Sequence, residues 1–284
     1  MATSEVILNI PGEDRQMSAL TIEREEQVTI IGMHTDRNTQ PPHAISKNVW
    51  ISLTTAFTEI SKDRDTRVVI LHGANNYFGT GANFHEILQV LDEDERNGDD
   101  KGAHEYWRIV NYAHTAIENC PKPVYAMIER FALGAACALA MACDMRIMAE
   151  DAKIGIPAPQ RGLTLGLRDT RRLVSKVGGA YATEILLEGN IYSAEDGYRM
   201  GLANRIVAAD KLKEEVMERA TRLAKENAPL AMKEAKNNIA MSLQNPGFAG
   251  IDETSWPIAW SGSRDLREGI VSFLERRDPI FIGE

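Results

Sequence analysis

Short runs rich in β-branched residues alternate with segments of helical spacing along much of the chain. Arg67–Gly73 and Pro123–Ile128 predict buried strands. The apolar positions from Ala44 to Lys62 keep the spacing of a helix, and His104–Glu118 predicts a second helix between the two strands. Because strand, helix and strand follow one another in this way, the sequence predicts an α/β protein with much parallel sheet.

The two ends of the chain depart from this alternation. Leu20–Glu23 and Val28–Met33 predict an antiparallel hairpin, and the acidic run from Asp92 to Gly102 is too polar to pack and predicts a mobile surface loop. After a last strand at Asn204–Val207 only helical segments follow. Their expected bounds are Lys211–Asn227, Leu230–Leu243, Ala249–Trp260 and Arg264–Arg276.

The segment Phe131–Asp144 combines a turn of small residues with a helix of small residues. A helix N-terminus presents unpaired backbone N–H groups and a partial positive charge. A second glycine-rich loop, Phe78–Ala82, follows the strand Arg67–Gly73. Loops at the ends of parallel strands come together, so we expect two backbone N–H donors to meet there and stabilise a negatively charged oxygen.

Composition narrows the class of ligand. The chain has 284 residues and a net charge of −9, which disfavours nucleic acid or an anionic membrane as the main partner. No apolar run approaches the ~18 residues needed to span a bilayer, and Met1–Gln16 is unlike a signal peptide. Three cysteines form no CxxC pair, and no two histidines have the spacing of a metal site. We therefore expect a cytoplasmic protein with a small-molecule ligand and no metal.

An ordered set of short motifs resembles the crotonase (enoyl-CoA hydratase/isomerase) superfamily over roughly residues 19–283. The matching pieces are Arg67–Gly73, Phe78–Ala82, Pro121–Val124, Phe131–Gly134, Cys143-Asp144, Leu187–Gly189, Ser193–Asp196, Gly201-Leu202, Arg267–Ile270 and Phe273–Arg277. The resemblance implies an α/β fold with a crotonase-like spiral of β-β-α units. It divides the chain into a leader (1–18), a spiral core (19–209) and a C-terminal helical trimerisation region (210–284).

The same resemblance implies a homotrimer or hexamer with a coenzyme A thioester as substrate and no tightly bound cofactor. The backbone N–H groups of Thr80 and Ala135 would form the oxyanion hole, with Ala82 beside the substrate. One such donor is typically worth about 10²–10³-fold in rate.

The departures from the family pattern concern acid–base chemistry. Family hydratases add water with two glutamates, and the matching positions here are Ala138 and Ala158. Neither alanine can hold a water or move a proton. Other branches place an aspartate at the position of Gly166, which this chain lacks as well. Ordinary two-glutamate hydration is therefore not expected, and the two alanines are expected to line the substrate site.

Four residues are candidates to replace the missing glutamates. Asp169 follows Gly166 by one helical turn, and His72 ends a strand against the first loop. Each also has a structural interpretation, Asp169 as a first-turn carboxylate and His72 as a core histidine. Gln160 and Arg161 could orient a carbonyl or a water.

Three functions remain open from the sequence. The first is an enzyme, a lyase, isomerase or hydrolase, that stabilises an enolate or tetrahedral oxyanion of an acyl-CoA or related carbonyl compound. The second is a C–C hydrolase of a β-diketone. The third is a non-catalytic family member that binds the ligand unchanged, because alanine keeps the helix while removing the charge.

Overall fold

The computed structural model of the protein describes residues 4–5, 19–39, 41–244 and 263–284. Strands and helices alternate through most of them, which confirms the α/β prediction. In chain order the elements are β1 (Ser4–Glu5), β2 (Leu20–Glu25), β3 (Val28–Met33), α1 (Lys47–Lys62), β4 (Val68–Gly73), α2 (Phe84–Asn97), α3 (Lys101–Glu118), β5 (Val124–Ile128), β6 (Phe131–Leu133), α4 (Ala135–Ala142), β7 (Met145–Ala149), β8 (Lys153–Gly155), the 3-10 helix η1 (Pro159–Arg161), α5 (Leu167–Glu188), β9 (Ile191–Ser193), α6 (Ala194–Met200), β10 (Arg205–Val207), the 3-10 helix η2 (Ala209–Lys211), α7 (Leu212–Glu226), α8 (Pro229–Gln244) and α9 (Arg264–Glu275).

The described strands form two sheets. The larger has the order β1-β2-β3-β4-β5-β7-β10, and β6, β8 and β9 form the smaller. β2 and β3 are an antiparallel hairpin, while from β3 to β10 all neighbours run parallel. β5 is buried at every residue, as expected for a short apolar run in the middle of a parallel sheet. The predicted hairpin and the predicted parallel sheet are both confirmed.

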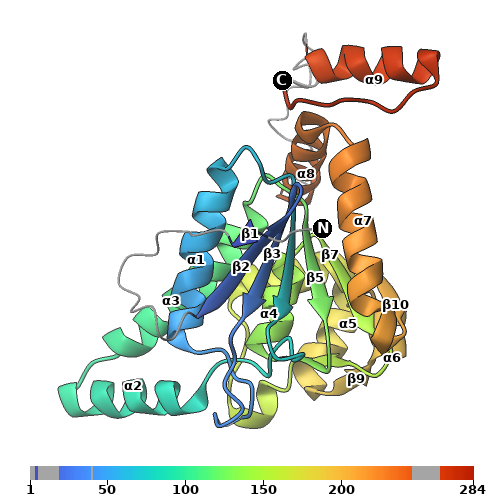
Figure 1. Cartoon of the computed structure of the whole chain (residues 1–284). Helices are drawn as coiled ribbons and strands as arrows, with labels where there is room; N and C mark the ends of the chain where they lie inside the picture. Colours follow the sequence, from blue (N-terminus) through green and yellow to red (C-terminus); the bar gives the residue numbers. More distant parts are fainter. Residues whose placement is uncertain (1–3, 6–18, 40, 245–262) are drawn as a thin grey trace.

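Helices cover both sides of the large sheet (Figure 1), with α1 on one side and α7 on the other. α1 begins where the sequence changes from loop to periodic spacing, at Ser46, whose hydroxyl accepts the Val49 N–H. Its buried face includes Trp50 and Phe57. α3 packs along α1. The packing of α3 matters for function, because the site described below lies between α2, α3 and the start of α5.

The acidic run after Leu91 is helical, so the loop predicted there is wrong. α2 continues to Asn97 and ends at Gly98, and α3 begins only three residues later. The buried carboxylate of Asp94 explains this, because its two oxygens accept the N–H groups of Gly102 and Ala103 at 2.9 and 2.7 Å. A residue taken for a solvated charge thus caps the next helix.

Phe131–Leu133, expected as part of a turn, is instead the strand β6, paired in parallel with β8. Gly134 (φ 55°) then makes the turn into α4. The C-terminal part is helical as predicted, with α7, α8 and α9 among the described residues. The helix predicted at 249–260 lies outside the described ranges, and so does the predicted leader (1–18) apart from β1. None of the described helices is long and apolar enough to cross a membrane.

Candidate active site

Two loops that follow buried strands are joined by backbone hydrogen bonds beside the start of α4. The Gly79 N–H donates to the carbonyl of Phe131 at 2.9 Å, and the Leu133 N–H donates to the carbonyl of Gly79 at 3.0 Å. A Cβ on Gly81 would stand 3.0 Å from the Leu133 carbonyl oxygen and 3.4 Å from the Ala135 nitrogen, and its φ is 108°. Only glycine fits this close approach, so the two loops meet as the sequence predicts.

Among the described residues, free backbone N–H groups lie on both sides of this junction. Ala135 is the first residue of α4 and has no acceptor within the helix, and the Ala82 N–H forms no hydrogen bond either. The Thr80 N–H, by contrast, donates to the carbonyl of His43 at 3.1 Å. The segment before α1 therefore occupies the donor that the sequence analysis selected, and the free N–H groups of this loop are those of the next two residues, Gly81 and Ala82.

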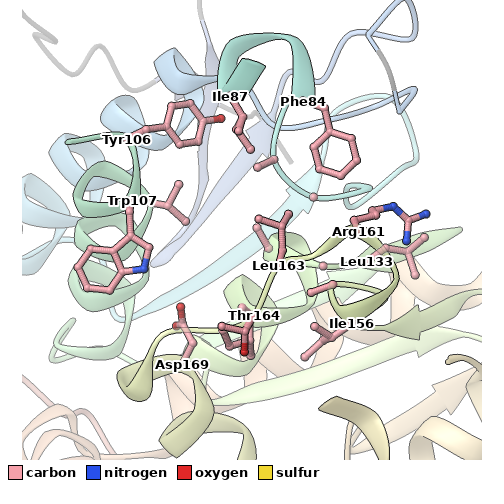
Figure 2. A pocket seen from close by; sticks show the side chains of 18 of the residues that line it. Phe84, Ile87, Tyr106, Trp107, Leu133, Ile156, Arg161, Leu163, Thr164 and Asp169 are labelled. Atoms are coloured by element: carbon pink, nitrogen blue, oxygen red, sulfur yellow. The ribbon is translucent and has the colours of Figure 1, made fainter. Parts of the chain in front are cut away.

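Both loops border a cavity of about 710 Å³ (Figure 2). Its walls are mainly apolar, with Phe84 from α2, Trp107 from α3 and Leu163 and Ile156 from the segments before α5. Seven of the predicted site residues line it: Thr80, Ala82, Ala135, Ala138, Ala158, Arg161 and Asp169. A cavity of this size, apolar with a few polar groups, is typical of a small-molecule site.

Asp169 is the one acidic residue that lines the cavity within the described part of the chain. It lies in the first turn of α5, 5% exposed, and Figure 2 shows its carboxylate pointing toward the cavity. Oδ1 accepts a hydrogen bond from His114 Nδ1 at 2.9 Å and another from the Arg172 guanidinium at 2.6 Å. Oδ2 has no hydrogen bond with any described residue. One oxygen is thus anchored while the other is left for a ligand.

These contacts keep the carboxylate ionised. Burial raises the pKa of Asp169, but the electrostatic attraction and hydrogen bonds of His114 and Arg172 outweigh it and hold the pKa below its ordinary value of 3.8. Arg172 is itself held by Glu118 at 2.7 Å and by the Thr115 hydroxyl at 3.2 Å. The result is a buried chain of charges that fixes Asp169 in one orientation.

His114 is not among the site residues predicted from the sequence, but the structure places it at the cavity. It is fully buried, lines the cavity and meets the ring of Trp50 edge-on, with centroids 5.5 Å apart. Because a carboxylate only accepts, Nδ1 carries the proton that is donated to Asp169. Nε2 is buried and has no partner among the described residues. No spacing rule could have paired His114 with Asp169, because they come from different helices, α3 and α5.

His72 is not part of this cavity, so its predicted catalytic role is not supported. It lines a separate cavity of about 190 Å³, next to Lys213 and Met217 of α7 on the other side of the sheet. Burial lowers the pKa of its imidazole, and Nδ1 lies 3.1 Å from the carbonyl oxygen of Gly73. His72 does end a strand, as predicted. Successive side chains of a strand point to opposite faces of the sheet, and that of His72 points to the face covered by α7, away from the cavity between the two loops.

Of the two neighbouring residues Gln160 and Arg161, only Arg161 lines the cavity. Gln160 does not line the cavity, because its amide donates to the carbonyl of Gly189 at 2.9 Å and so joins η1 to the end of α5. Arg161 does line the cavity, and its guanidinium donates to the carbonyl of Pro157 at 2.7 Å. No cluster of His, Cys, Asp and Glu that could hold a metal ion occurs among residues 4–5, 19–39, 41–244 and 263–284.

Comparisons with known proteins agree with the fold. The family model described as "Enoyl-CoA hydratase/isomerase" matches residues 23–284. The Bacillus subtilis protein named "Probable enoyl-CoA hydratase" is 31% identical and aligns over 94% of this chain and 100% of its own length. The crotonyl-CoA hydratase of Syntrophomonas wolfei is 29% identical over 93% and 98% of the two chains. The crystal structure of an enoyl-CoA hydratase/carnithine racemase from Magnetospirillum magneticum superposes with a TM-score of 0.85, at 29% identity over 95% and 97% of the two chains.

Proposed function

The chain belongs to the enoyl-CoA hydratase/isomerase family, and from this premise we propose that it moves a proton along the acyl chain of a CoA thioester without adding water. The reaction would be the shift of a carbon–carbon double bond. The observation that carries the proposal is that Asp169, the one carboxylate among the described residues lining the cavity, faces a space bordered by free backbone N–H groups of both loops.

The N–H groups of Ala82 and Ala135 would bind the thioester oxygen. A proton leaves C2 of the 3-enoyl thioester or C4 of its 2-enoyl isomer. The negative charge then spreads through the conjugated system to the carbonyl oxygen, where two fixed donors stabilise it. The donors are preorganised, because Gly79, Gly81 and Leu133 hold the two loops together through backbone contacts. The positive end of α4 adds to the effect.

Asp169 would carry the proton. Its free Oδ2 takes a proton from one carbon and delivers a proton to another, either the same proton or one exchanged with solvent in between, so no co-reactant is consumed and the charge balances at each step. His114 and Arg172 touch only Oδ1 and would serve as positioning residues. The apolar walls around the carboxylate exclude water and strengthen these interactions.

Hydration requires more than the cavity provides. Adding water needs a group that holds and activates the water and a group that supplies the second proton. The positions matching the family glutamates, Ala138 and Ala158, both line the cavity and leave methyl groups there. We therefore propose that this chain shares the fold of the relatives named hydratases but transfers a proton without adding water.

A panel of 2-enoyl and 3-enoyl CoA thioesters of increasing chain length tests the proposal. We expect the two isomers to interconvert and no 3-hydroxyacyl product to accumulate, as measured by liquid chromatography with mass detection. Accumulation of the 3-hydroxyacyl product would contradict it in favour of hydration. Thioesters that bind in calorimetry but return unchanged would point to a non-catalytic binding protein, and cleavage of a β-diketone would point to a C–C hydrolase.

The pH dependence of the rate gives a second prediction. The pKa of Asp169 is lowered, so the base form is present at neutral pH and is lost only as the pH falls through this lowered value. Arg172→Gln removes one of the two partners that lower it. The acidic limb of the kcat/KM profile should therefore move to higher pH. The control is Arg199→Gln, which breaks the equivalent first-turn pair with Asp196 of α6. An acidic limb that does not move in Arg172→Gln would rule out Asp169 as the titrating group.

A further inference from the structure

Another cavity lies on the outer side of α3 and α5, next to the candidate active site. It measures about 530 Å³ and is lined by three arginines, two aromatic rings and an exposed leucine. The lining residues used below are Arg108, Arg168, Arg171, Trp107, Tyr112 and Leu167. Leu167 is 86% exposed and Trp107 53% exposed, so this wall is open to a ligand in the single chain.

Two of the three arginines have no carboxylate partner among the described residues. Arg168 donates only to the Thr115 hydroxyl, at 3.2 Å, and Arg171 makes no hydrogen bond or ion pair there. Arg108, by contrast, is already paired with Glu105 at 3.2 Å. Both unpaired arginines stand in the first turns of α5, where the helix dipole is positive and Gly166 supplies no side-chain cap. In a chain with a net charge of −9, these two unpaired guanidinium groups would attract an anion locally.

The two cavities share Trp107 and Asn111 in their walls. Asn111 is 8% exposed, its amide NH₂ donates to the Trp107 carbonyl at 2.9 Å, and its Oδ1 is buried without a partner. In Figure 2 Trp107 and Asp169 lie at one side of the first cavity, and Leu133, next to the oxyanion loops, lies at the other. An acyl chain that starts at the loops and passes Asp169 therefore reaches the shared wall of Trp107 and Asn111, and the arginines lie on the other side of that wall.

We propose that the enzyme takes CoA thioesters whose acyl chain carries a carboxylate at its far end, and that Arg168 and Arg171 bind this carboxylate. The inference rests on the proposed function, because it assumes that the thioester carbonyl is bound at the loops. A guanidinium is well suited to the role, since it binds a carboxylate through paired, charge-assisted hydrogen bonds. The aromatic rings beside it would flank the last carbons of the chain.

The phosphates of CoA offer the same anionic chemistry, so the test separates the two sources. Binding is measured by calorimetry for saturated CoA thioesters of six, eight and ten carbons, each with either a methyl group or a carboxylate at the far end, and for free CoA. Saturated chains cannot isomerise, so the readout does not depend on turnover. The variants are Arg168→Gln and Arg171→Gln, and the control is Arg222→Gln, an exposed arginine of α7 that lines neither cavity.

At the best chain length we expect the carboxylate thioester to bind about tenfold more tightly than its methyl partner, and high salt to reduce this preference. Arg168→Gln and Arg171→Gln should remove the preference while leaving free CoA and the methyl thioester unchanged, and Arg222→Gln should keep it. Equal binding of the two thioesters by the unmodified chain would overturn the inference, and so would equal weakening of free CoA in the arginine variants. Neither result bears on double-bond migration, which is measured with methyl-ended enoyl thioesters.

Discussion

Asp169→Asn is expected to lower the rate of deuterium incorporation from heavy water into the acyl chain by about 10²–10⁴-fold, the usual contribution of a general acid or base. Asparagine has the same shape and can still accept from His114 and Arg172 through its carbonyl oxygen. It cannot take a proton from carbon at neutral pH. Proton NMR of the recovered thioester measures the exchange, and calorimetry measures whether binding is kept.

Asp196→Asn provides a matched control for this variant. Asp196 also lies in the first turn of a helix and pairs with the arginine three residues later, at 2.9 Å compared with 2.6 Å for Asp169 and Arg172. Both variants lose a first-turn ion pair, but only Asp169 lines the cavity. If exchange survives in Asp169→Asn at the unmodified rate, another group moves the proton and our assignment fails.

Ala135→Pro is expected to lower the rate by about 10²–10³-fold, the value of one oxyanion donor. Proline has no N–H and is well tolerated at the first position of a helix, where the N–H has no helical acceptor. Ala135 occupies that position in α4. The substitution therefore removes this hydrogen-bond donor and puts the ring Cδ in its place while the helix remains, which thermal unfolding checks.

Ala135→Ser is the control for this experiment, because it adds a side-chain atom of similar size but keeps the backbone N–H. Its rate should stay within a few-fold of the unmodified chain. A proline variant that is folded and fully active would show that the N–H of Ala135 does not bind the reacting oxygen. Equal losses in the serine and proline variants would instead indicate that the site tolerates no added side-chain atoms.

The sequence predicts well what depends on neighbouring residues. The apolar runs at Val68–Gly73 and Val124–Ile128 are strands, and the serine at position 193 caps α6 by accepting the Asp196 N–H. The meeting of the two glycine loops was also predictable, because the ends of adjacent parallel strands lie at one edge of the sheet. Local patterns and sheet geometry determine all of these features.

Features that depend on contacts between distant segments were harder to predict. His114 and Asp169 are 55 residues apart, and only the packing of α3 against the start of α5 joins them. Thr80 loses its free N–H to His43, a residue from the loop before α1. The polarity of Asp94 suggested a loop, but the buried carboxylate is satisfied by the next helix. In each case the deciding partner lies outside the window that a pattern can cover.

The absence of hydration is the central claim, and one doubly labelled reaction tests it most directly. The unmodified protein is incubated with a 3-enoyl CoA thioester, and in a parallel reaction with its 2-enoyl isomer, in heavy water enriched in oxygen-18, and the products are examined by mass spectrometry and NMR. From each substrate we predict the other isomer, with deuterium in the acyl chain wherever the Asp169 proton exchanges with solvent, and no oxygen-18 in the acyl chain. A 3-hydroxyacyl product carrying oxygen-18 would show that water is added despite Ala138 and Ala158, and would contradict the account.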